Sequence, residues 1–247
     1  MEKKKMNIGK EWVVTMQLSG KDKELFSVYK SELPLVTELC EDFIGGRKLR
    51  EIKLADFGGG TGEVTEFLKK VLKTKIRCTC FDVNNDLLDK NNSADIKINI
   101  NLTELQEKEK FDVGIMRFVL NYNTKESQIK ILQNVHTALK KEGIFLNWWC
   151  GTSEEGHQKR FNTLFSTKKV NGKLFRPNSY WTTWKENEQL FEKAGFKLEV
   201  VRKFDLPVHH LYQIRYELSD QENKKILTFL DNFNFISYVI FKATKVN

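Results

Sequence analysis

Strand-like and helix-like stretches alternate along most of the chain. The stretches with the alternating or fully apolar pattern of strands are 51–57, 75–82, 94–99, 111–116, 144–149, 197–204 and 236–242. Between the first two, apolar residues recur at helical spacing at Val64, Phe67, Leu68, Val71 and Leu72. Alternation of strands and helices is typical of an α/β fold. The pattern therefore predicts a doubly wound, mostly parallel sheet with helices on both faces.

Further helices are expected between the later strands. A short helix is predicted near 87–88, and the charged segment 103–110 is also expected to be helical. Two more are predicted from apolar stripes at Ile131, Leu132, Val135 and Leu139, and at Trp184, Leu190, Phe191 and Ala194. The chain has 247 residues, of which 40% are hydrophobic, and this suffices for one domain with a sizeable core. We therefore expect a single domain over 1–247, with 1–50 as an N-terminal helical segment.

The strand-like stretch 51–57 leads into four glycines, Gly58, Gly59, Gly60 and Gly62, which an amphipathic stretch follows. Glycine carries no Cβ and tolerates positive φ, so a glycine-rich backbone can turn tightly and lie flat against a ligand. The alternative is a tight strand-to-helix turn without a ligand, which rarely needs four glycines. The stretch therefore predicts a cradle for a nucleotide-type cofactor.

The spacing of these glycines narrows the choice of cofactor. A dinucleotide fingerprint requires glycine or alanine at the sixth place of G-x-G-x-x-G, where this chain has Glu63. No lysine follows the glycines, as a phosphate-binding P-loop would require. The next strand-like stretch ends on Asp82, about 20 residues past the glycines, as in a βαβ unit. Its carboxylate only accepts hydrogen bonds and suits the two neighbouring hydroxyls of a ribose.

The pattern Asp56-x-Gly58-x-Gly60-x-Gly62 resembles motif I of the class I S-adenosylmethionine (SAM) methyltransferases. Three later segments are similar to parts of small-molecule methyltransferases: 117–120, 138–143 and 190–196. The resemblance runs in order from Glu51 to the C-terminus. It implies a Rossmann-like methyltransferase fold with a seven-stranded sheet, mostly parallel, whose last strand is antiparallel.

The resemblance also implies that SAM is the cofactor and how it is bound. The residues that it assigns to the cofactor are Asp56, Gly58, Gly59, Gly60, Gly62, Asp82, Arg117 and Phe118. Family members usually place an acid after the third strand to meet the adenine amine. This chain offers Asn99 or Asn101 there.

Methyl transfer from a sulfonium chiefly requires alignment, and a general base helps when the nucleophile carries a proton. The preferred base is His157, in the long polar and aromatic stretch 150–180, which we expect to be a lid or a substrate-binding insertion. The other histidines, less favoured as bases, are His136, His209 and His210. Tyr29 and Arg117 are expected to reach the cofactor or the acceptor, with packing and a surface ion pair as their alternative roles.

Aromatic residues bear on the kind of acceptor. Trp148, Trp149, Trp181 and Trp184 could wall a pocket that stacks on a flat ring or on an amine. Core packing is the alternative interpretation. The expected partner is a small molecule, aromatic or an amine.

Charge and composition limit the partners, the location and the metal content that the sequence predicts. The net charge of +8 could indicate a nucleic-acid partner, but lysines alternate with glutamates, as in 107–110, and this is typical of solvated helix faces. No apolar stretch approaches the ~20 residues of a membrane span, and no secretory core follows Met1, so a cytoplasmic protein without a membrane partner is expected. The four cysteines lack zinc-site spacing, so no metal is expected.

These observations favour an enzyme that moves a methyl group from SAM to an oxygen or nitrogen of a small molecule. One alternative is an RNA or protein methyltransferase, which the charge favours. Another is a SAM-binding protein without catalysis, because fold does not fix function.

Overall fold

The computed structural model of the protein describes residues 23–152, 156, 158–159, 162–163, 169–170, 173–174, 180–207 and 235–246. The strands of its main sheet are β1 (Glu51–Phe57), β2 (Lys75–Asp82), β3 (Ile96–Asn99), β4 (Phe111–Arg117), β5 (Leu139–Gly151), β8 (Phe196–Pro207) and β9 (Phe235–Lys245). The helices are α2 (Lys23–Arg47), α3 (Glu63–Val71), α4 (Asn85–Lys90), α5 (Lys125–Ala138) and α7 (Trp184–Lys193), with 3₁₀ turns η1 (Leu102–Glu104) and η2 (Leu120–Tyr122). A separate two-stranded sheet pairs β6 (Lys169–Val170) with β7 (Lys173–Leu174).

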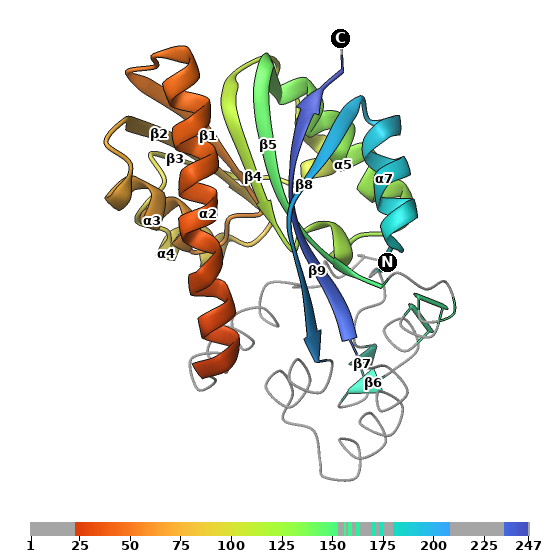
Figure 1. Ribbon diagram of the computed structural model, residues 1–247. Helices are drawn as coiled ribbons and strands as arrows, with labels where there is room; N and C mark the ends of the chain where they lie inside the picture. Colours follow the sequence, from red (N-terminus) through yellow and green to blue (C-terminus); the bar gives the residue numbers. More distant parts are fainter. Residues whose placement is uncertain are drawn as a thin grey trace.

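The main sheet has seven strands in the order β3-β2-β1-β4-β5-β9-β8 (Figure 1). The pairings among β1 to β5 are parallel, whereas β9 is antiparallel to both β5 and β8. The predicted mostly parallel seven-stranded sheet with an antiparallel last strand is therefore confirmed. The carboxyl ends of the parallel strands meet at one edge, the lower one in Figure 1.

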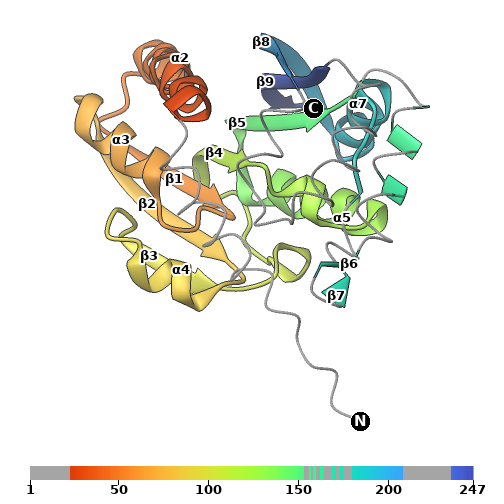
Figure 2. The same cartoon turned by 90° about the horizontal axis from the view of Figure 1, so that it is seen from below.

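Helices cover both faces of this sheet, as a doubly wound fold requires (Figure 2). Residues alternate between the faces, so Leu54 joins a buried cluster with α2 and α3, whereas Phe57 joins another with α5 and α7. The apolar stripe predicted in α5, including Ile131 and Leu132, is buried. The two clusters bury apolar surface on both sides of the strands and hold the strand ends in place.

The prediction of a helix over 103–110 is wrong. Only the single turn η1 forms, and beyond it Glu109 has a left-handed φ of 43°. The N–H groups of Glu109 and Lys110 donate to the carbonyls of Thr137 and Ala138, both at 2.8 Å. The segment thus satisfies the last carbonyls of α5, and those N–H groups are not free to build a helix of their own.

Helix α2 lies within the predicted N-terminal helical segment. Among the helices that the structure describes, none has the length and apolar character needed to cross a membrane.

Candidate active site

The glycine loop between β1 and α3 closes one side of a cavity at the carboxyl edge of the sheet. The N–H of Gly58 donates to the carbonyl of Phe81 at 2.6 Å and joins the loop to β2. A Cβ on Gly59 would overlap the carboxylate of Asp56, and Gly60 has a φ of 51°, where side chains are strained. Gly62 is the N-cap of α3.

The cavity has a volume of about 350 Å³, within the range of small-molecule sites. Of the residues predicted to bind the cofactor, those that line it are Asp56, Gly58, Gly59, Gly60, Asp82, Asn101, Arg117 and Phe118. Further lining residues include Glu63, Val83, Asn84, Leu87, Lys90, Leu102, Val119, Tyr122 and Asn123. Gly62 and Asn99 are not part of this lining.

Asp82 lies at the carboxyl end of β2 with both carboxylate oxygens oriented. Oδ2 accepts the N–H of Gly60 at 3.0 Å, and Oδ1 accepts the N–H of Asn84 at 2.9 Å. Burial raises the pKa of Asp82, while the N–H groups of Asn84, Gly60 and Val83 oppose the rise. Each oxygen keeps a lone pair, so a pair of ribose hydroxyls could donate to this carboxylate.

Asp56 is buried beneath the glycine loop and accepts the Thr65 hydroxyl at 2.7 Å. Burial raises its pKa to about 7; the Thr65 hydrogen bond and the charge of Arg117 lower it, and the charge of Asp82 raises it further. The carboxyl group therefore titrates near neutral pH, next to the floor of the cavity.

Two polar residues that the sequence interpretation missed, Asn91 and Ser93, hold this loop from outside. Asn91 is fully buried, and its Nδ2 donates to the carbonyl of Gly60 at 3.1 Å, while the Ser93 hydroxyl donates to the carbonyl of Gly62 at 2.9 Å. Asn84 caps α4 by accepting the N–H of Asp86. The run Asn-Asn-Ser after a short helix indicates a turn, and this was the available signal.

The two asparagines after β3 are placed differently. The Nδ2 of Asn99 donates to the carbonyl of Asp82 at 3.1 Å. Asn101 lines the cavity and caps η1, with its Oδ1 accepting both the N–H and the hydroxyl of Thr103. Asn101 is therefore the one of the two that faces a ligand in this cavity.

Arg117 is the last residue of β4 and Phe118 follows it, and both line the cavity. The guanidinium carbon of Arg117 lies 5.6 Å from the centre of the Phe118 ring. Phe118 has a φ of 57°, a strained conformation for a residue with a side chain, and it turns the chain away from the strand. Strain of this kind occurs most often where a ligand site fixes the backbone.

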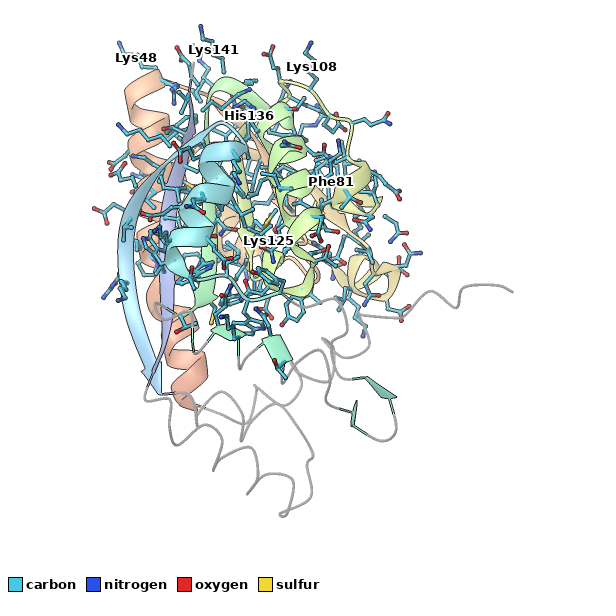
Figure 3. All side chains as sticks on the ribbon, turned by 90° about the vertical axis from the view of Figure 1, so that its right-hand side faces the viewer. Lys48, Phe81, Lys108, Lys125, His136 and Lys141 are labelled. Carbon is cyan, nitrogen blue, oxygen red and sulfur yellow. The ribbon has the colours of Figure 1, made fainter. Side chains whose placement is uncertain are left out.

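Among the described residues that line the cavity there is no histidine. His157 lies outside the described residues, as do His209 and His210. Tyr29 belongs to α2, but its side chain is outside the described part. His136 packs on Phe196 with ring centres 5.0 Å apart. It lies in the upper half of Figure 3 toward Lys108 and Lys141, away from the carboxyl edge.

The four tryptophans pack in the core and do not line the cavity. Trp148, Trp149 and Trp181 are at most 6% exposed, and Trp149 lies edge-on to Trp184 at 5.4 Å. The Trp149 Nε1 donates to the Thr182 hydroxyl at 2.7 Å. The core-packing alternative therefore describes these residues, and the aromatic pocket does not form from them.

The two ends of the expected insertion lie side by side near the cavity wall. Thr152 bridges to Thr183, and the Gln128 Nε2 donates to the carbonyls of Asn123 and Tyr180 at 3.1 and 2.7 Å. Glu186 accepts from Lys125 and from the Tyr180 hydroxyl, both at 2.9 Å, and it also contacts Gln158. This junction of α5, α7 and the insertion ends adjoins Asn123, a lining residue.

In the described part of the chain, no three His, Cys, Asp or Glu side chains gather as metal ligands would. The cysteines Cys40, Cys78, Cys80 and Cys150 are free and buried. Burial raises the pKa of Cys40 and of Cys78 to about 12, so these thiols are poor nucleophiles.

Comparison with known proteins agrees with this geometry. Residues 55–145, from β1 into β5, match the family model described as a methyltransferase domain. This segment of the chain is therefore similar to a methyltransferase domain. The description of the matching model gives methyl transfer as the activity, and similar structures from Burkholderia thailandensis and Haemonchus contortus contain S-adenosylhomocysteine and S-adenosyl-L-methionine, respectively. No curated protein matches the sequence.

Solved structures similar to this chain share its fold at low identity. The YcgJ protein from Bacillus subtilis is 14% identical, with a TM-score of 0.68 over 88% of this chain and 99% of that one. A protein described as a sarcosine dimethylglycine methyltransferase from Galdieria sulphuraria is 13% identical, with a TM-score of 0.62 over 88% and 85%. The 1,6-didemethyltoxoflavin-N1-methyltransferase of Burkholderia thailandensis is 14% identical, with a TM-score of 0.53 over 98% and 91%.

The residues present fit SAM. The glycine loop that lines the cavity, the oriented carboxylate of Asp82 and the charged set of Asp56, Glu63 and Arg117 match a ribose with a charged amino-acid group.

Proposed function

We propose that this protein transfers the methyl group of SAM to an oxygen or nitrogen of a small molecule. The observation that carries the proposal is one cavity whose lining continues from the glycine loop past Asp82 to Tyr122 and Asn123. SAM, when bound, supplies a methyl group activated by a positively charged sulfur. Asp82 would hold the ribose and Arg117 the carboxylate of the cofactor or acceptor, so the protein acts chiefly by alignment.

The acceptor would bind on the side of Tyr122 and Asn123, next to the insertion 150–180. The support is the junction at Thr152 and Tyr180, which holds both ends of that insertion beside the cavity wall. The names of two similar structures specify small acceptors, sarcosine or dimethylglycine and 1,6-didemethyltoxoflavin. These names support a small amine or a nitrogen-containing ring as the acceptor class.

His157 is the proposed general base, and Tyr29 a proposed contact to cofactor or acceptor. A base would take the proton of a hydroxyl or ammonium acceptor and would contribute ~10²- to 10⁴-fold to the rate. His157→Gln should therefore lower turnover and leave SAM affinity unchanged, whereas the control His136→Gln should leave both unchanged.

The four reduced cysteines support the proposed cytoplasmic location.

Calorimetric titration with SAM and separately with NAD, followed by an acceptor screen, tests the function. We expect SAM to bind, NAD not to bind, and Asp82→Ala to weaken SAM binding. Turnover of SAM with a small hydroxyl or amine acceptor would support the proposal. Binding of SAM without turnover over a broad acceptor panel would overturn it in favour of a non-catalytic role. Turnover confined to RNA, with salt-sensitive affinity, would overturn the small-molecule assignment.

A further inference from the structure

The order of the strands sets the direction in which SAM would lie. In the strand order β3-β2-β1-β4, Asp82 ends β2, with Arg117 at the end of β4 on one side and Asn101, which follows β3, on the other. With the ribose on Asp82, the charged amino-acid group extends toward Asp56 and Arg117. The adenine then extends the other way, between the exposed Val83 side chain and the segment that begins at Asn101.

The orientation of the Asn101 carboxamide is fixed by its neighbours. The N–H of Thr103 can only donate, so the atom 3.0 Å from it is the oxygen of the carboxamide. The Thr103 hydroxyl donates to the same oxygen at 2.9 Å. A carboxamide oxygen has two lone pairs, and both are used in capping η1. What Asn101 can offer a ligand is therefore its NH₂ group, which donates and cannot accept.

The outer edge of adenine carries a 6-amine, which donates, and the ring nitrogen N1, which accepts. A donor on the protein can pair with N1 but not with the amine. We propose that Asn101 recognises adenine through a hydrogen bond from its Nδ2 to N1 and makes no hydrogen bond to the 6-amine. An acid at this position, as is usual in related enzymes, would accept a hydrogen bond from the 6-amine and could not donate one to N1. This inference rests on SAM being the cofactor.

Calorimetric titration of the full-length protein with three ligands distinguishes recognition of N1 from recognition of the 6-amine. They are S-adenosylhomocysteine, its 6-desamino analogue, which keeps N1, and its 1-deaza analogue, which keeps the amine. The desamino analogue should bind within about three-fold of S-adenosylhomocysteine. The 1-deaza analogue should bind roughly ten-fold more weakly, a loss of about 1.4 kcal/mol, because one hydrogen bond is lost and Asn101 is left without its acceptor.

Two substitutions link the effect to this side chain. Asn101→Ala should weaken S-adenosylhomocysteine roughly as the 1-deaza change does, and the two losses should not add, since they remove one bond. Asn101→Asp retains a cap for η1 and adds a free acceptor, so it should make the desamino analogue bind roughly ten-fold more weakly than S-adenosylhomocysteine. The matched control Asn99→Asp should not change the preference.

The outcomes are distinct. Equal binding of the 1-deaza analogue and S-adenosylhomocysteine by the unmodified protein would overturn the inference and leave the cofactor assignment standing. Loss of affinity on removing the amine alone would also overturn it. Failure of S-adenosylhomocysteine and SAM to bind at all would overturn the cofactor assignment together with the inference.

Discussion

At the scale of single residues, the site combines two aspartates in different surroundings. Asp82 is held by backbone N–H groups and faces the cavity, whereas Asp56 is buried under the loop and accepts a hydroxyl. Two negative charges close together repel each other, so the charge of Asp82 adds to burial in raising the pKa of Asp56. Their separate surroundings suit Asp82 to ligand contact and Asp56 to support of the loop.

The first prediction concerns the titration of Asp56. Its pKa in the folded protein is about 7, raised chiefly by burial from the ordinary 3.8. A group whose pKa rises on folding stabilises the fold most below its unfolded pKa, and this contribution is lost as pH rises through the folded pKa. The free energy of unfolding of the unmodified protein should therefore fall relative to Asp56→Asn between pH 4 and 7 and stay level above.

Urea unfolding of both proteins across that pH interval measures the difference. Asparagine keeps an oxygen for the Thr65 hydroxyl, so the comparison isolates the charge. A difference in unfolding free energy that did not vary with pH would contradict the burial argument.

The second prediction concerns Gly59. An added Cβ would overlap the Asp56 carboxylate, so Gly59→Ala must displace either the loop or that side chain. We expect a loss of about 1–3 kcal/mol in unfolding free energy and weaker SAM binding. Gly45 in α2 has no heavy atom within 4 Å of its Cβ position, so Gly45→Ala is a matched control that should stabilise by about 0.5–1 kcal/mol. Equal effects of both substitutions would refute the steric interpretation.

At the scale of elements, the junction of α5 and α7 depends on Glu186. Its side chain completes a capping box with Thr183 at the start of α7 and pairs with Lys125 at the start of α5. Burial alone would raise the pKa of Glu186, but hydrogen bonds from Lys125, Thr183 and Tyr180 outweigh this and hold it below its usual value. The stabilisation is therefore present above the unfolded pKa and is lost as pH falls through the folded one.

A series of substitutions along α7 tests this junction. Thr183→Ala should cost about 1 kcal/mol through the cap alone. Glu186→Ala should cost more, because it also breaks the link to Lys125 and Tyr180. The exposed Glu188 on the same helix is the matched control, and Glu188→Ala should stay within about 0.5 kcal/mol of the unmodified protein in denaturant unfolding. A cost for Glu186→Ala no larger than that for Thr183→Ala would exclude the junction as a stabilising contact.

At the scale of the whole molecule, the cofactor cavity joins loops from four strands of one sheet. A ligand bound there stabilises only the folded state. At 100 times its dissociation constant it should add about 2.7 kcal/mol to the unfolding free energy and raise the melting temperature by roughly 5–10 °C. Thermal unfolding with and without S-adenosylhomocysteine measures this, and Asp82→Ala should show a smaller shift at the same concentration. An unchanged melting temperature in the unmodified protein would argue against a ligand site in this cavity.

The parts of the fold and site that are local in sequence could be predicted. The glycines and Asp82 follow directly after strand patterns, so their place at the carboxyl edge follows from the parallel sheet. Thr65, Asn91 and Ser93 could not be assigned, because their bonds to the loop depend on how separate elements pack. The segment 103–110 has helical composition, but the N–H groups of its last two residues donate hydrogen bonds to the carbonyls at the end of α5. The burial of the tryptophans likewise depends on which face of the sheet receives them.

The place of β9 has a consequence for biosynthesis. In the described sheet β9 lies between β5 and β8, and β8 is joined to the other strands only through it. A ribosome makes β5 and β8 before residues 235–245, so both strands emerge with open edges. Open edges can pair with other chains. Until β9 emerges, these open edges therefore expose the nascent protein to aggregation, which a chaperone would prevent.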